Sequence, residues 1–570
     1  MKALTARALF CLGFSFLAFS ARAQTPPPEA SLPGAACATA HPLATRACLH
    51  MLEQGGNAID AAVAASAALA VVEPTGSGLG GGGFWLVHNA ADQTDVFIDG
   101  RETAPAAARA DMYLDANGQA DPWRARNGAL AAGIPGEPAA LVHLSERYGQ
   151  LPLARALQPA IDYARDGFAV DAKLARAIVQ HQSRFSAEAA RIFAPNGTPL
   201  NEGQTLQQSD LAATLQALAA RGVAGFYQGE VAQKLVDGAR QNGGIWTLDD
   251  LRGYRIVERA PVVTQFRDYR IISAPLPSAG GIAMAQVFQQ LEVLGFKDDA
   301  SALRQHQLIE TLRRAYRDRA AWLGDSDFVR VPVTELSARS YAIELASSIN
   351  LTRATASREL PPATPSGEGT NTTHLSVIDA QGNRVAATLS INLPFGSGTV
   401  AAGTGVLLND EMDDFSSQVG AANAYGLVGS APNAIAPHKR PLSSMSPTFV
   451  EGPRGILVIG TPGGSRIITM VIQGVLNWIN GDALSQVVSA PRLHHQYLPD
   501  VVQLEPDTLT QPARAQLAQM GHTLQTEENP WGNMQAVSWE PQNGGLHAAS
   551  DPRGVGQGVV IYRTALADVP

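Results

Sequence analysis

The sequence predicts an α+β protein in which layers of β-sheet are stacked between helices. Residues 135–350 carry mostly helical patterns, with one clear interior strand near 269–277. Residues 354–371 are rich in proline and polar side chains and have the composition of a linker. After residue 371 the pattern changes to strands. This order of helices and strands, linker, then strands and helices is typical of stacked layers.

The first predicted elements are two helices and a pair of strands. Residues 41–74 contain both helices, and Gly55-Gly56 separates them. The second helix is rich in alanine and apolar nearly all round, so we expect it to be buried. Residues 84–88 and 94–98 have strand composition and are expected to pair with each other.

Two further predictions follow the linker. Residues 374–380 and 384–392 flank a Gln-Gly-Asn turn, which predicts a β-hairpin. Residues 455–479 read as a buried strand, a glycine turn and an apolar helix.

Residues 1–23 predict a secretory signal. Lys2 and Arg7 precede an apolar run over residues 8–19, and Ala21-Arg22-Ala23 fits a small-x-small cleavage site. An uncleaved membrane anchor is the alternative, but the apolar run is short for a span. We therefore expect a mature chain starting near Gln24, in the periplasm or secreted.

Charge and composition limit the classes of partner. Of the 570 residues, 45% are hydrophobic and 16% charged, as in an ordinary globular protein. Residues 1–23 hold three basic and no acidic residues, so their removal takes the formal charge from −9 to −12. An acidic surface argues against nucleic acid as a partner and does not favour anionic membranes.

The remaining cysteines leave two interpretations open. Cys11 is removed with the signal, whereas Cys37 and Cys48 stay. An exported protein can join them in a disulfide, or both can be buried thiols. Two cysteines are too few for a four-thiolate zinc site.

Several common signatures do not fit. Gly76, Gly78 and Gly81 match G-x-G-x-x-G, but an apolar helix precedes them and a strand follows, the reverse of a dinucleotide site. A turn with close backbone packing is the better interpretation. The chain has no G-x-S-x-G elbow. His494-His495 are adjacent and point different ways, so they are a weak metal pair. We expect no metal and no cofactor.

Thr372 and Thr373 lie where the linker meets the hairpin. Threonine favours strands, so an ordinary loop-to-strand junction is one interpretation. The other is a nucleophile, whose hydroxyl needs a base. A free α-amino group titrates near about 7.7–8.0 and can be that base. The bond between Asn371 and Thr372 would first have to break, by attack of the Thr372 hydroxyl on the Asn371 carbonyl.

The chain resembles the γ-glutamyltranspeptidase family of the N-terminal nucleophile hydrolases. The resemblance covers nearly the whole mature chain, and the matching segments occur in family order. The segments are QGGNAIDAAVA (54–64), GLGGGGFWL (78–86), DGRETAP (99–105), NTTHLSVID (371–379), NDEMDDFS (409–416), KRPLSSMSPT (439–448), TPGGSRIIT (461–469) and APRLHHQYLPD (490–500).

This resemblance implies a four-layer αββα sandwich formed jointly by two subunits of one precursor. The large subunit would be residues 24–371 and the small subunit residues 372–570. Thr372 would be the nucleophile, and Thr373 would form hydrogen bonds around it. Ser390 stands where relatives often have threonine, so the hydroxyl is kept.

The resemblance also implies how substrate is held. Arg101, Ser443 and Ser444 would bind the α-carboxylate of the substrate. Asn392, Glu411 and Asp414 would receive its α-ammonium group; at 411 some bacterial relatives have glutamine.

Two loops complete the implied site. Gly463 and Gly464 would present backbone N–H groups to the developing oxyanion, an interaction worth about 3–4 kcal/mol per donor. Tyr425 matches the tyrosine of a loop that closes over the site in some members.

The expected activity is cleavage of γ-glutamyl amides such as glutathione, through an ester on Thr372. The group would pass to water, amino acids or peptides. One alternative is a cephalosporin (glutaryl) acylase, whose side chain has no amino group to meet Glu411 and Asp414. Another is an inactive relative that only binds ligand, which would be expected to lose Thr372 or the glycine pair.

Overall fold

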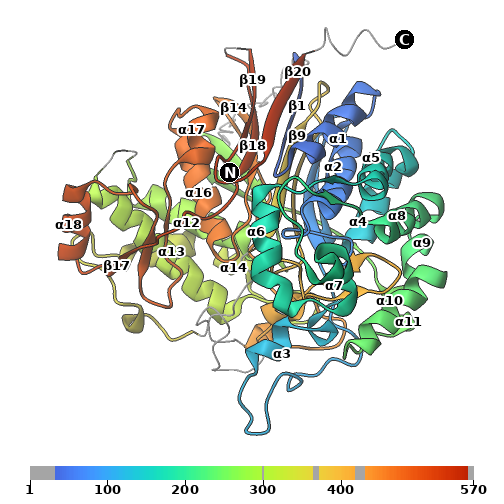
Figure 1. The fold of residues 1–570 in the computed structure, drawn as a ribbon. Helices are drawn as coiled ribbons and strands as arrows, with labels where there is room; N and C mark the ends of the chain where they lie inside the picture. The colour runs from blue at the N-terminus through green and yellow to red at the C-terminus, as the bar shows by residue number, and fades with distance from the viewer. Residues whose placement is uncertain are drawn as a thin grey trace, which may run out of the picture. The chain divides into compact units, whose positions relative to one another are not determined.

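A computed structural model describes residues 32–297, 299, 301–363, 371–416, 431–542 and 544–562. Two β-sheets form its centre (Figure 1). The first sheet has the strand order β20 (Gln557–Tyr562), β1 (Gly34–Thr39), β9 (Thr372–Ile378), β10 (Arg384–Ser390), β2 (Gly82–Asn89), β3 (Thr94–Gly100) and β6 (Val257–Arg259). The second has the order β19 (Gly545–Ser550), β18 (Gln535–Glu540), β14 (Gly455–Gly460), β13 (Thr448–Gly452), β8 (Tyr269–Ser273) and β7 (Val262–Phe266).

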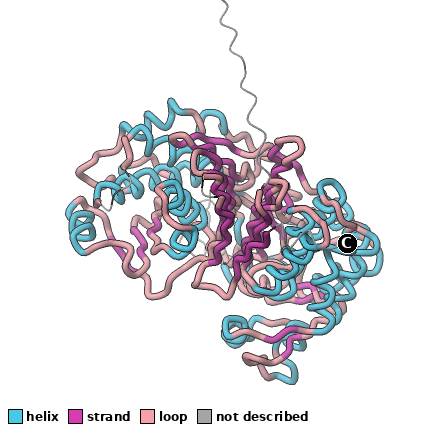
Figure 2. Tube along the Cα trace, turned by 90° about the horizontal axis from the view of Figure 1, so that it is seen from above, coloured by secondary structure: helices cyan, strands magenta, loops and turns pink. Residues whose placement is uncertain are grey.

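Helices cover the outer face of each sheet, as Figure 2 shows with the two groups of strands side by side between them. The core against the first sheet includes α1 (Pro42–Glu53), α2 (Ala58–Val72), α4 (Glu137–Tyr148), α5 (Leu153–Asp166), α6 (Ala172–His181), α7 (Ala187–Phe193), α8 (Ser209–Arg221), α9 (Ala224–Tyr227), α10 (Gly229–Gln241) and α11 (Leu248–Gly253). The core of the second includes α12 (Gly280–Val293), α13 (Ala302–Trp322), α14 (Val333–Leu336), α16 (Arg466–Ile479), α17 (Leu484–Ser489) and α18 (Gln511–Gln519). The predicted αββα sandwich is confirmed.

The remaining elements are short. They are α3 (Pro122–Arg126), α15 (Arg339–Ser347), β4 (Phe168–Ala169), β5 (Thr205–Leu206), β11 (Val400–Ala401), β12 (Val406–Leu407), β15 (Leu493–His494), β16 (Val502–Leu504) and β17 (Leu524–Thr526). Among the described residues, no helix combines the length and apolar character needed to cross a bilayer.

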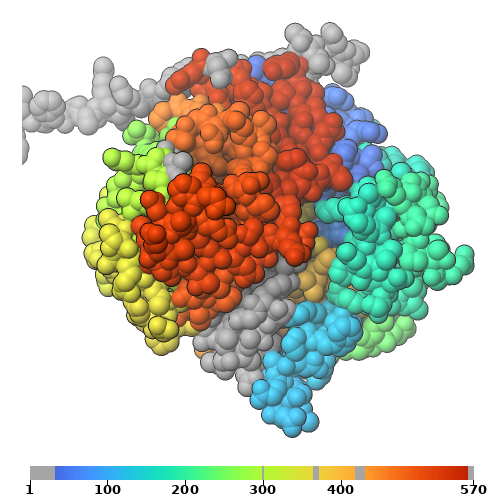
Figure 3. Space-filling model, turned by 60° about the vertical axis from the view of Figure 1, so that its left-hand side comes forward, coloured from blue at the N-terminus to red at the C-terminus, as the bar shows by residue number. Residues whose placement is uncertain are grey.

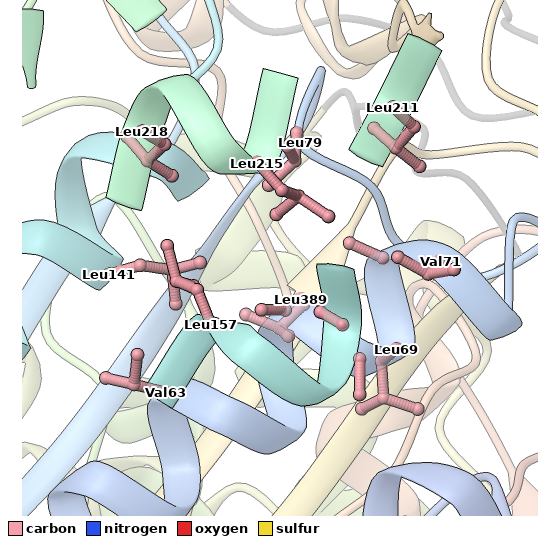
Figure 4. Packing of buried hydrophobic residues seen from close by; sticks show 14 of the residues in the cluster. Val63, Leu69, Val71, Leu79, Leu141, Leu157, Leu211, Leu215, Leu218 and Leu389 are labelled. Carbon is pink, nitrogen blue, oxygen red and sulfur yellow. The ribbon is translucent and has the colours of Figure 1, made fainter. Parts of the chain in front are cut away.

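Helix α2 explains much of the first core. All of its residues are buried, as its uniform apolar pattern predicts. Asn57 caps its start with a capping box that uses Asp60. Figure 4 shows Val63, Leu69 and Val71 of this helix among leucines from neighbouring helices and Leu389 of β10. Burying one such side chain stabilises the fold by about 1.5–3 kcal/mol.

Strand β9 alternates between the two cores, as a fully buried strand must. Leu375 and Val377 pack in the core with the helices of the first layer. Ile378 packs in the core shared with the second sheet. His374 lies on that same side, where its ring faces Gly460 of β14. The residues of β9 therefore have different neighbours on each face.

The chain segments before and after the Asn371–Thr372 bond each contribute strands to both sheets. In the first sheet, β9 lies between β1 and β10, and β10 lies against β2. In the second, β8 pairs with β13. Figure 3 shows the yellow part of the chain, which precedes Thr372, against orange-red residues late in the sequence. A hydrogen bond joins two such segments: the Ala354 N–H donates to the Met520 carbonyl, 2.7 Å. A cut before Thr372 would leave two interleaved chains.

Of the two interpretations of the cysteines, the structure shows the disulfide. Cys37 of β1 and Cys48 of α1 are bonded, and both are fully buried. The bond ties the first helix to the strand that pairs with β9.

Candidate active site

Thr372 is the first residue of β9 and is 8% exposed. It lies opposite Ser390, the last residue of β10. The Ser390 hydroxyl donates to the carbonyl oxygen of Asn371, 3.2 Å, and accepts from the Asn392 N–H, 2.8 Å. A polar hydroxyl therefore already contacts the peptide carbonyl that immediately precedes Thr372.

The end of this hairpin is fixed by Asn392. Its φ of 75° is left-handed, a conformation that asparagine tolerates better than most residues. Its carbonyl accepts from the Asn371 N–H, 3.1 Å, and its side-chain amide donates to the Asp410 carbonyl, 2.9 Å. Asn392 thus connects the segment before Thr372 to the acidic run 409–414.

That run is buried, unlike the solvated loop that such a composition often forms. The Asn409 amide donates to the carbonyls of Gly80 and Gly133, 2.6 and 2.8 Å. Asp413 accepts from Arg126, 3.0 Å. Burial raises the pKa of Asp413 to about 6, although Arg126 opposes the shift. These contacts fix the backbone from which Glu411 and Asp414 project.

Arg101 is the centre of the charged group. It is 1% exposed and donates to Glu411, 2.7 Å, and to Asp414. Burial alone would lower the pKa of Arg101, but the neighbouring carboxylates raise it. Burial and the charge of Glu411 raise the pKa of Asp414 well above its usual value, against the effect of Arg101. The structure thus joins the predicted ligands for carboxylate and for ammonium in one ion pair network.

Ser443 and Ser444 are buried and follow closely after Pro441, a residue that contacts Arg101. The carbonyl of Pro441, two residues before Ser443, accepts from Arg101 Nε, 3.4 Å. The Ser443 N–H donates to the Pro277 carbonyl, 2.9 Å, and its hydroxyl accepts from the Met445 N–H, 3.1 Å. The serine pair is therefore held on a fixed backbone next to Arg101.

Gly463 and Gly464 form the turn between β14 and α16. Their φ values, 139° and 59°, are ones that favour glycine. Strand β14 reaches this turn after Gly460, where a Cβ would lie 2.3 Å from the His374 ring. His374 belongs to β9 and is two residues after Thr372. The contact between Gly460 and His374 therefore sets the distance between β14, which leads to the glycine pair, and β9, which carries the predicted nucleophile.

His374 is held as a neutral ring. It is fully buried, and burial lowers its pKa to about 3. Its two nitrogens bond the hydroxyls of Thr388, 2.8 Å, and Ser376, 3.1 Å. A hydroxyl can accept from a protonated ring nitrogen and donate to an unprotonated one, so both contacts suit the neutral form.

The glycine cluster packs closely against this hairpin, as predicted. A Cβ on Gly81 would lie 2.1 Å from the Ser390 carbonyl oxygen. One on Gly80 would lie 1.8 Å from the Leu407 carbonyl oxygen. Side chains at either place would displace the backbone that carries Ser390 and the acidic run.

Thr373 points to the other face of β9. Its hydroxyl donates to Glu73 at the end of α2, 2.6 Å, so its predicted hydrogen bonds around the nucleophile stay a prediction. The sequence interpretation missed Glu73. A signal was present: an ionisable residue directly after a wholly apolar helix and before a glycine-rich turn is unusual.

Tyr425, the predicted lid residue, lies outside the described residues. Both adjacent histidines have protein partners: His494 bonds Thr469, 2.9 Å, and His495 bonds Asp500, 3.2 Å. Within the described ranges, two other clusters have metal-ligand spacing, His306 with Glu310 and His522, and His88 with Asp95 and Glu451. Glu310 pairs with Arg313 and Arg314, and Glu451 pairs with Arg270 and Arg384. Arginines thus balance the charge of both clusters.

Known proteins resemble this chain over most of its length. The family model Gamma-glutamyltranspeptidase matches residues 44–561. A glutathione hydrolase proenzyme of Pseudomonas sp. (strain A14) is 43% identical over 519 residues, 89% of each chain. One of Escherichia coli (strain K12) is 42% identical, covering 90% of this chain and 89% of the relative. The crystal structure of a cephalosporin acylase from Bacillus halodurans superposes with a TM-score of 0.80 at 28% identity, covering 96% of this chain and 99% of that one. With this match and the geometry around Thr372, the chain belongs to the γ-glutamyltranspeptidase family.

Proposed function

We propose that this protein is an autoprocessed γ-glutamyltranspeptidase and glutathione hydrolase. It cleaves γ-glutamyl amides and transfers the γ-glutamyl group to water, amino acids or peptides. The observation that carries the proposal is the position of Thr372: it starts a buried central strand, with the Ser390 hydroxyl on the preceding carbonyl. Relatives named as glutathione hydrolase proenzymes support the same activity.

Processing comes first. The Thr372 hydroxyl attacks the carbonyl carbon of Asn371, and the Ser390 hydroxyl stabilises the oxygen that becomes negative. The C–N bond breaks and leaves an ester, which water hydrolyses. The products are a large subunit of residues 24–371 and a small subunit of residues 372–570 that begins with a free α-amino group on Thr372.

Turnover uses the same hydroxyl. The α-amine of Thr372 accepts the hydroxyl proton while the oxygen attacks the γ-carbonyl of the substrate. The amine product leaves with a proton, and an ester of the γ-glutamyl group remains. Water or an acceptor amine then attacks this ester. Backbone N–H groups of Gly463 and Gly464 stabilise the oxyanion in both steps.

Substrate recognition uses the charged network. Arg101 binds the α-carboxylate with Ser443 and Ser444, and Glu411, Asp414 and Asn392 receive the α-ammonium group. In the present structure Arg101 bonds both acids directly. A zwitterionic group can replace these contacts one for one, because its carboxylate meets the arginine and its ammonium meets the acids.

The alternative function is a cephalosporin (glutaryl) acylase, and one structural relative is named a cephalosporin acylase. A glutaryl group has no ammonium, so its carboxylate would be placed beside the buried acids Glu411 and Asp414 without a cation for them. That observation favours the γ-glutamyl substrate. The inactive binding protein is disfavoured by the retained Thr372, Gly463 and Gly464.

The location that we propose is the periplasm or the outside of the cell. Residues 1–23 provide the signal, and the Cys37–Cys48 disulfide suits an oxidising compartment. The experiment is intact mass and N-terminal sequencing of the wild type and of Thr372→Ala, with γ-glutamyl and glutaryl anilides as substrates. We expect a small subunit starting at Thr372 only in the wild type. Cleavage of Thr372→Ala at this bond, or a preference for the glutaryl anilide, would overturn the proposal.

A further inference from the structure

Among the described residues, the first residues of β9 have a strand partner on one side only. On one edge, β10 pairs with β9 from Thr372 onward. On the other edge, the pairing with β1 begins at Leu375, opposite Thr39. Within the part of the chain that the structure describes, residues 372–374 therefore lack the second ladder of hydrogen bonds that holds the rest of this strand in the sheet.

Glu73 contacts this half-paired segment. The Thr373 hydroxyl donates to Glu73 Oε2, 2.6 Å, a short charge-assisted hydrogen bond. Glu73 is 7% exposed and is the residue at which α2 ends. Because α2 is buried along its whole length, the carboxylate projects from a rigid support.

The other oxygen of the carboxylate has its own partner. Lys173 Nζ of α6 lies 3.1 Å from Glu73 Oε1. One oxygen thus accepts from Thr373 and the other bonds a cation, so each oxygen of the carboxylate is held by its own partner.

Gly76 permits the close approach. A Cβ there would lie 3.2 Å from Glu73 Oε2 and 3.3 Å from the Thr372 carbonyl oxygen. The carboxylate and the Thr372 carbonyl therefore both lie close to Gly76, where a side chain would be tightly packed against each of them.

We propose that Glu73 is a positioning residue that holds the new amino-terminal strand after cleavage. This inference rests on the proposed function. Cleavage removes the covalent link before Thr372, and strand ends without full pairing fray. The bond from Glu73, in the large subunit, to Thr373, in the small subunit, replaces that link and keeps the Thr372 hydroxyl and amine in register with substrate.

The test compares fully processed variants by kcat and KM for a γ-glutamyl anilide. We expect Glu73→Gln and Thr373→Val each to lower kcat by about tenfold or more, since small misplacements of a nucleophile are costly. KM should change less than about twofold, because no substrate ligand is altered. Thr373→Ser keeps the hydroxyl and should restore kcat. The double variant Glu73→Gln/Thr373→Val should be no slower than the slower single variant, because both act on the same bond: glutamine removes the charge of the acceptor and valine removes the donor.

Asp60→Asn is the matched control for Glu73→Gln. Asp60 is a fully buried carboxylate at the opposite end of α2, where it accepts from the N–H groups of Asn57, Gln150 and Leu151. The Asp60→Asn variant should have a lower melting temperature than the wild type and an unchanged kcat. Should Glu73→Gln fail to fold, the Thr373→Val and Thr373→Ser pair still decides the question at the other end of the bond.

Three results would overturn the inference. Two of them are kcat within twofold of wild type in Thr373→Val and single effects that multiply in the double variant. An equal loss of kcat in Asp60→Asn would also overturn it, since general loosening of α2 would then be the cause. Failure of the proposed function itself is separate, because it appears as wild-type protein that does not hydrolyse the anilide.

Discussion

The Ser390 hydroxyl donates a hydrogen bond to the Asn371 carbonyl oxygen at 3.2 Å. The two residues are brought together because Ser390 ends β10 opposite the start of β9. The Asn392 N–H donates to the same hydroxyl, 2.8 Å, and so directs its proton toward the carbonyl. This carbonyl belongs to the peptide bond that we propose is cut. The Ser390 hydroxyl is therefore already placed to donate to the oxyanion that forms during processing.

Ser390→Ala should slow the appearance of the small subunit by about 100- to 1,000-fold, the effect of losing one oxyanion donor. Ser390→Thr keeps the hydroxyl and should process at close to the wild-type rate. The measurement is the fraction of cleaved chain against time on a denaturing gel. Equal processing of the alanine and threonine variants would exclude this role.

Arg101→Lys should raise KM for a γ-glutamyl anilide by about tenfold or more with a smaller change in kcat. Lysine keeps the charge but loses the planar fork that bonds Glu411 and Asp414 together. Arg101→Met removes the cation that bonds both of these buried acids and should destabilise the protein by about 3–5 kcal/mol. Steady-state kinetics of the processed Arg101→Lys protein measure KM and kcat. Urea unfolding of Arg101→Met in the uncleaved Thr372→Ala protein measures the loss of stability. An unchanged KM in Arg101→Lys would remove Arg101 from substrate binding.

Gly460→Ala should impair both processing and turnover. Its Cβ would meet the His374 ring at 2.3 Å, and overpacking of this kind costs about 1–3 kcal/mol. The strand would move away from β9 and carry Gly463 and Gly464 with it. Gly253→Ala is the control, since nothing lies within 4 Å of its Cβ. Processing and kcat of both variants are compared, and equal values would show that the contact does not set the geometry.

The contribution of three buried histidines to the free energy of unfolding should fall as pH is lowered from about 6.5 toward 4. Burial lowers the pKa of His494 and His522 to about 3 and that of His495 to about 4. In this window each of these histidines is protonated more in the unfolded chain than in the folded one, so each contributes a loss of about 1.4 kcal/mol per pH unit.

The pH effect is measured by urea unfolding of uncleaved Thr372→Ala protein at pH 7, 6 and 5. Adding His522→Gln should reduce the slope of the unfolding free energy against pH by about 1.4 kcal/mol per pH unit, the contribution of one proton. Groups with the opposite sign, such as Asp413 with its pKa raised to about 6, contribute equally to both proteins and cancel in the comparison. An identical slope would mean that His522 is protonated in the folded state.

The local elements could be predicted from the order of the residues alone. The apolar run of α2, the Gln-Gly-Asn turn between β9 and β10, and the strand, glycine turn and helix of residues 455–479 all follow from periodicity and turn chemistry. Hydrophobic period tells which face of an element is buried. The segments shared with the family also predicted the nucleophile and the residues that bind substrate, without any knowledge of which side chains are in contact.

Which of these residues contact one another became visible only in the folded chain. Arg101 reaches Glu411 across 310 positions, and Thr373 reaches Glu73 across 300. Period 2 in β9 shows that Thr372 and Thr373 face opposite ways, but not that a helix end supplies Glu73 on one side. The reason is physical: a strand pattern fixes the direction of a side chain, whereas its partner depends on how distant segments pack, which local sequence does not encode.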